Sequence, residues 1–108
     1  MHNDVAFSDY VASHVPNAFA MEPVTPGLLE SVIAREINRL INSDFSLLLS
    51  ILYRLDVSEV KLKDMLKDNP GQDSGLVITR LILEREFEKY KSRQRFHKED
   101  NIPDDERW

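Results

Sequence analysis

The sequence predicts an all-α fold, a compact bundle of helices with an N-terminal arm and a disordered, acidic C-terminal tail. Apolar residues recur at helical spacing through most of the chain, and residues that favour helix starts precede these segments. Proline and glycine fall between them, and 108 residues suffice to bury one core. We expect an arm at 1–24, a bundle domain at 25–96 with four helices at about 26–42, 44–55, 57–67 and 74–95, and a tail at 97–108.

The arm at 1–24 is rich in apolar residues but is interrupted by Pro16 and Pro23. The spacing of Phe7, Tyr10 and neighbouring valines predicts a short helix over about residues 4–15. These side chains need a surface to cover them, either on the same bundle or on a second copy. We therefore expect a homodimer stabilised partly by the arm, with Phe7 and Tyr10 as candidate interaction residues.

Two helices follow the arm. The first begins with Thr25 as the expected cap and Pro26 in the first turn, and its apolar residues form one stripe. Ser43 is the expected cap of the second, which is apolar around most of its circumference. A helix of this kind is typical of a bundle centre, so we expect Leu48 and Leu52 in the middle of the core.

The segment at 52–66, "LYRLDVSEVKLKDML", contains the break between the second and third helices. Asp56 and Glu59 have the spacing of a capping box, which predicts a structural corner. The alternative is a DNA-binding helix-turn-helix, but Asp56 stands where that motif has its turn glycine. Glu59 and Asp64 would also face the phosphates, so the corner is the favoured interpretation.

The last helix follows a loop that contains two of the three glycines of the chain. Asn69 and Asp73 could each cap this helix, and we favour Asp73. Glu84, Glu86 and Glu88 are expected on a solvated side, where Glu86 would form a surface pair with a lysine three residues later.

A basic cluster with one aromatic residue lies at the end of the last helix. Cations are favourable at a helix C-terminus, and basic residues mixed with aromatics also suit a nucleic-acid backbone. The acids of the following tail can screen such a surface from phosphate. The candidate interaction residues of this cluster are Lys89, Lys91, Arg93, Arg95 and Phe96.

Composition argues against several functional classes. The chain has no cysteine, and its net charge of −5 disfavours a broad surface for nucleic acid or anionic lipid. No segment resembles a signal peptide or a membrane span, so we expect a cytoplasmic protein. The three histidines share no helical face and no catalytic motif occurs, so we expect no enzyme, cofactor or metal site.

The stretches "INSDFSLLLSILYRLDVSEVKLKDML" and "LVITRLILEREFEKYKSR" resemble small all-helical bacterial proteins of uncharacterised function, over about residues 28–93. The resemblance implies a compact helical domain and no particular site residue.

Two hypotheses for function remain. The first is a non-enzymatic protein-interaction or adaptor module that associates with itself and with an unknown protein. The alternative is a nucleic-acid-binding protein that uses the segment at 52–66 or the basic end of the last helix.

Overall fold

The computed structural model describes the backbone of residues 5–98 and the side chains of residues 5–94. The predicted all-α class is confirmed within these residues, whereas the count of four helices is not, because the arm folds into a fifth. The predicted tail falls outside the described residues except for residues 97 and 98, which belong to the last helix. The elements are α1 (Val5–Ala18), a short 3-10 turn η1 (Pro26–Leu28), α2 (Leu29–Ser43), α3 (Phe45–Arg54), α4 (Glu59–Asp68) and α5 (Ser74–Lys98).

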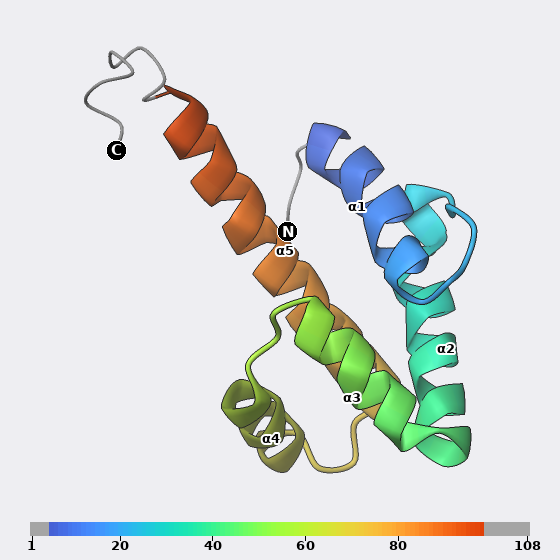
Figure 1. Ribbon diagram of the computed structural model, residues 1–108. Coiled ribbons are helices and arrows are strands. Elements are labelled where there is room, and N and C mark those ends of the chain that lie inside the picture. Colours follow the sequence, from blue (N-terminus) through green and yellow to red (C-terminus); the bar gives the residue numbers. More distant parts are fainter. Residues whose placement is uncertain (1–4, 99–108) are drawn as a thin grey trace.

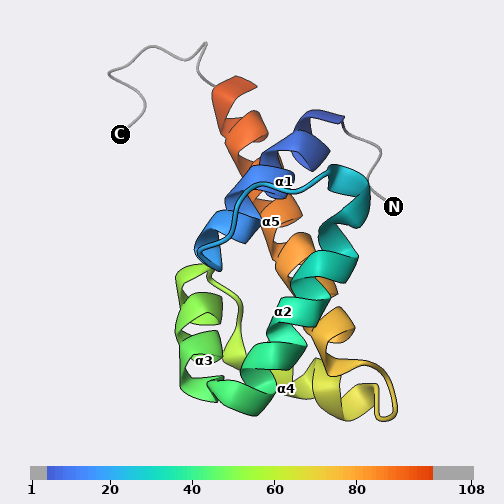
Figure 2. The same ribbon diagram turned by 90° about the vertical axis from the view of Figure 1, so that its right-hand side faces the viewer.

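The long helix α5 organises the bundle (Figure 1). Helices α1, α2 and α4 pack against α5, and α3 packs against α2. Both views show that the C-terminal turns of α5 extend beyond the other helices (Figure 2). None of the described helices has the length and apolar character needed to cross a membrane. The most buried apolar core residues are Val15, Ile33, Ile37, Leu40, Leu48, Ile78, Leu81 and Ile82.

Helix α1 packs on its own chain. Phe7, Val11 and Val15 are buried in the same core as the other helices. The ring of Phe7 meets the ring of Phe87 edge-on at a centroid distance of 5.0 Å and lies 5.2 Å from that of Tyr90. The apolar side of the arm is therefore covered by α5 of the same chain.

The caps predicted for the first two helices of the bundle are wrong. The carboxylate of Asp44, rather than the hydroxyl of Ser43, accepts from the amide of Leu47 at 3.1 Å and caps α3. Ser43 instead donates to the carbonyl of Arg39 one turn earlier. Thr25 precedes η1 but forms no capping hydrogen bond through its side chain. Adjacent Ser and Asp residues are both good caps, so local sequence does not distinguish them.

The predicted central position of α3 is wrong. Seven of its ten residues, "FSLLLSILYR", are apolar, but they are covered on one side only. Leu48 and Leu52 lie in the core, as predicted. Other large apolar side chains of α3 are exposed, namely Phe45, Leu47, Leu49 and Tyr53.

The start of α5 crosses α2 at Gly75. The Asp73 carboxylate accepts from the amides of Gly75 and Leu76 at 2.9 and 3.3 Å, which confirms the predicted cap. From α2, Asn38 donates to the same carboxylate oxygen at 2.8 Å and accepts from the Gly75 amide at 3.0 Å. The Asn38 hydrogen bond, with those from the amides, lowers the pKa of Asp73. A β-carbon at Gly75 would collide with the backbone oxygen of Ala34 and the side chain of Asn38.

We expect Gly75→Ala to lower the free energy of unfolding by about 1–3 kcal/mol, because the added methyl group forces α2 and α5 apart. Gly27→Ala is the matched control, since a β-carbon there meets no atom within 4 Å. It should change stability by less than about 0.5 kcal/mol. Urea denaturation measures both, and equal stability of the two variants would refute the close crossing.

Candidate functional site

The α3–α4 joint, residues 55–58, is a helix C-cap followed directly by a helix N-cap. Asp56 has a φ of 61°, and the amides of Asp56 and Val57 donate to the carbonyls of Tyr53 and Leu52, both at 3.1 Å. This is the Schellman arrangement, in which a residue in the left-handed conformation ends a helix. Asp56 occupies the position that glycine usually takes.

The predicted capping box at this joint is wrong. The residue that caps α4 is Ser58, whose hydroxyl accepts from the amide of Lys61 at 3.2 Å. Asp56 cannot cap α4, because it already ends α3 in the left-handed conformation. The segment therefore forms a structural corner through Asp56 as the end of α3 and Ser58 as the cap of α4, not through the Asp56–Glu59 capping box that the spacing indicated.

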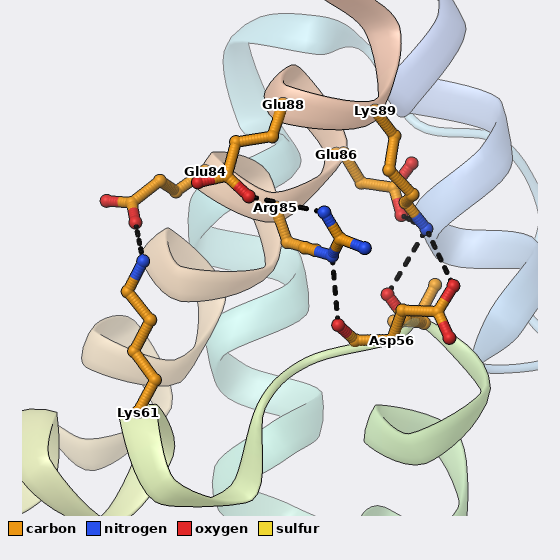
Figure 3. Close-up of polar contacts among 8 residues, drawn as sticks. Asp56, Lys61, Glu84, Arg85, Glu86, Glu88 and Lys89 are labelled. Carbon is orange, nitrogen blue, oxygen red and sulfur yellow. Dashed lines mark hydrogen bonds and ion pairs between the residues drawn. The ribbon is translucent and has the colours of Figure 1, made fainter. Parts of the chain in front are cut away.

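Side chains from α5 hold the joint in place (Figure 3). Arg85 donates from Nε to the carbonyl of Asp56 at 3.0 Å. Lys89 donates to the carbonyl of Leu55 at 3.2 Å, and its ammonium lies 3.9 Å from the Asp56 carboxylate. The carbonyls at the end of α3, which lack partners within the helix, are therefore satisfied by cations of α5.

The hollow beside the joint is polar, with a volume of about 330 Å³. Its cations are paired with acids: Lys61 lies 2.7 Å from Glu84, and Arg85 lies 3.3 Å from Glu88. The hydrogen bond to Glu84 raises the pKa of Lys61. No group of three metal-ligating side chains occurs in the part of the chain that the structure describes. The Lys61–Glu84 pair connects α4 to α5, whereas Arg85 and Glu88 both lie on α5.

Glu86 is fully buried, so the prediction of a surface pair is wrong. Its carboxylate lies between Lys89, at 2.9 Å, and the imidazole of His14 on α1, at 3.5 Å. Neither contact has the alignment of a hydrogen bond. The helical spacing from the buried residues Ile78 and Ile82 is the signal that could have placed Glu86 on the inner side of α5.

The two arm residues predicted to form an interface are not equivalent in the structure. Phe7 is buried against α5. Tyr10 is half-buried, and its ring stacks on that of His14 at 4.9 Å. Most of the surface of Phe7 and Tyr10 is therefore covered by other residues of the same chain.

The predicted basic cluster is distributed among different contacts. Lys89 contacts the α3–α4 joint and the buried Glu86. Lys91 lies over the ring of Phe87 and Arg93 over the ring of Tyr10, each at 5.3 Å. Lys91 and Arg93 remain exposed to solvent. The structure describes no side chain for the other two members, Arg95 and Phe96.

The exposed side of α3 is the surface that sequence reasoning missed. Phe45, Leu49 and Tyr53, which we call the α3 stripe, are spaced four residues apart and are 52%, 42% and 83% exposed. The stripe borders a hollow of about 320 Å³ between α3 and α4. This α3–α4 hollow is lined by Leu49, Ser50, Leu52, Tyr53, Val57, Glu59 and Leu62.

Two substitutions separate the roles of Asp56 and Ser58. Ser58→Ala should lower the free energy of unfolding by about 0.5–2 kcal/mol, because the α4 cap is lost. Asp56→Val should cost about 1–3 kcal/mol, because a β-branched residue is strained at positive φ. Thermal denaturation measures both. Asp56→Gly is the control and should retain stability, since glycine adopts this conformation without strain.

Lys89→Met should lower the free energy of unfolding by about 3–5 kcal/mol, because it leaves the Glu86 carboxylate buried beside a weaker partner. Adding Glu86→Met should restore much of this loss, since two apolar side chains need no charge compensation. Chemical denaturation of the single and double variants measures the difference. A single variant as stable as the native chain would contradict the role of Lys89.

No protein-family model, curated protein or solved structure matches this chain. The resemblance to small all-helical bacterial proteins therefore stays a prediction.

Proposed function

We propose that this chain is a non-enzymatic, cytoplasmic protein-interaction module, and that the α3 stripe is its contact surface. The proposal rests on one observation: α3 is mostly apolar, but other helices cover only one side of it. The helix is apolar around most of its circumference, yet Phe45, Leu49 and Tyr53 face solvent. An apolar helix surface of this kind gains free energy when a partner covers it.

The arrangement of these residues distinguishes them from other exposed apolar side chains. Val5, Leu28 and Val60 are also exposed, but they lie on α1, η1 and α4. Isolated apolar residues are normal on protein surfaces. The α3 stripe instead places three large side chains on successive turns of one helix, which is the pattern of anchors in helix-mediated recognition.

The hollow beside the stripe provides a concave element of the same surface. Leu49 and Tyr53 form part of both the stripe and the wall of the α3–α4 hollow. A partner side chain inserted there would contact apolar atoms of both helices. Buried apolar anchors in such hollows contribute most of the binding free energy at protein interfaces.

The polar side chains near the joint support a structural role for that region. Lys61, Arg85 and Lys89 each contact an acid or a carbonyl of the same chain. These contacts hold α3 and α4 against α5 and so present the α3 stripe on a rigid support. A preorganised surface loses less conformational entropy when it binds.

Affinity capture from the native host tests the proposal. We expect a protein that is retained by the native chain and lost with the double variant Leu49→Lys/Tyr53→Lys, because two cations would have to be buried at the interface. The matched control is Leu28→Lys, since Leu28 is 56% exposed on η1, outside the stripe. Circular dichroism verifies that each variant is folded. An identical set of captured proteins with all three chains would refute the proposal.

A further inference from the structure

We infer that the acidic segment after α5, residues 99–108, lies back along the C-terminal turns of the same helix and covers their basic side chains. These residues make up most of the predicted tail and lie outside the described part of the chain. The contact is separate from the α3 stripe, so it neither requires nor excludes the proposed function.

Positive charge is concentrated at the end of α5. Residues 89–98 hold five of the fourteen Lys and Arg residues of the chain and no acid, although the whole chain has a net charge of −5. The eight cations before this segment are spread over α2, α3, α4 and the first half of α5, and four of them pair with an acid of the same chain. The C-terminal turns of α5 also extend beyond the other helices, which leaves them open to a partner (Figures 1 and 2).

Lys91 and Arg93 are the described members of this cluster that remain available to carboxylates. Both are exposed, and within the described residues neither forms an ion pair with an acid. The ring contacts with Phe87 and Tyr10 hold the two cations in place. A cation on a ring face still has N–H groups that point away from the ring, and its restricted side chain loses less entropy when a carboxylate binds.

The segment that follows α5 has the complementary charge. Residues 99–108, "EDNIPDDERW", contain five acids and one cation, and three of the acids are consecutive at 104–106. Residues 1–88 carry fourteen acids and eight cations, so most of the molecule repels this segment. One exposed ion pair contributes little, whereas several acids that face several cations form a network. The basic end of α5 is therefore the surface to which the segment is attracted.

The lengths of the two segments permit the contact. The axis of α5 between Lys91 and its last residue, Lys98, is about 10 Å long. An extended chain covers about 3.3 Å per residue, so residues 99–103 suffice to reverse direction and to bring the acids at 104–106 beside Lys91 and Arg93. The asparagine and the proline within 99–103 are residue types that favour turns. So short a connection gives the acids an effective concentration in the millimolar range, which populates even a weak contact.

Paramagnetic relaxation in the full chain tests the contact directly. The sequence has no cysteine, so Trp108→Cys provides a single attachment site for a nitroxide spin label. At about 20 mM salt the label should broaden the amide resonances of residues 89–94, and about 500 mM salt should remove most of this broadening by screening the charges. The same label in the triple variant Asp104→Asn/Asp105→Asn/Glu106→Gln is the reference for a segment that is only tethered. Equal broadening in both labelled chains would overturn the inference.

Access of a polyanion to α5 tests whether the segment covers the cations. Fluorescence anisotropy with a labelled oligothymidylate should show about tenfold tighter binding by the triple variant than by the native chain, because three ion pairs no longer compete. The matched control, Glu22→Gln/Asp64→Asn/Asp68→Asn, changes the net charge equally at exposed acids outside α5 and should bind like the native chain. Adding Lys91→Ala/Arg93→Ala to the triple variant should return its affinity to the native level. Equal affinities of the triple variant and the control would contradict the covering of α5.

A mixing experiment distinguishes a contact within one chain from a contact between copies. Isotope-labelled native chain mixed with spin-labelled chain of natural isotope content should show no broadening, because each segment binds its own α5. Broadening in this mixture would assign the segment to a second copy and overturn the inference. Broadening that depends on the acids at 104–106 without the gain in oligothymidylate affinity would place the segment elsewhere on α5, and would also overturn it. Circular dichroism verifies that every variant is folded.

Discussion

The close approach of α2 and α5 is the constraint on which the rest of the structure depends. At Gly75 the two helices are near enough for a residue of α2, Asn38, to hydrogen-bond the first turn of α5. This contact fixes the direction in which α5 leaves the crossing. Helices α1 and α4 both pack on α5, so their positions follow from that direction. The site follows as well, because Arg85 and Lys89 reach the α3–α4 joint from α5 (Figure 3).

The sequence predicted the positions of the helices well, but it predicted less well which residues contact them. Helical periodicity located the segments of the main bundle, and Asp73 was correctly identified as a cap because its carboxylate acts within two or three residues. The predicted capping box at Asp56 and Glu59 was wrong, since Ser is as good a cap as Asp and only the left-handed conformation of Asp56 shows that Ser58 caps α4. The carbonyls of Leu55 and Asp56 at this joint also accept hydrogen bonds from Lys89 and Arg85 of α5, which are remote in sequence.

The candidate surface could not be predicted for a related reason. Periodicity shows which sides of a helix are apolar, but it does not show how many of those sides have a neighbour. In α3 two neighbouring leucines have different environments. Leu48 is buried in the core, whereas Leu49 is exposed to solvent. Glu86 is the opposite case, because its charge suggested solvent while its helical phase places it inside, between Lys89 and His14. Each error came from reading a residue type without its tertiary neighbours.

The pairing of α1 with α5 has a consequence for synthesis of the chain. Phe7 and Phe87 are in ring contact, although they stand near opposite ends of the described sequence. Contacts of such high sequence separation form late, since they require closure of a long loop. During translation the apolar side of α1 cannot be covered until α5 has left the ribosome. Until then it is exposed to chaperones or to other nascent chains.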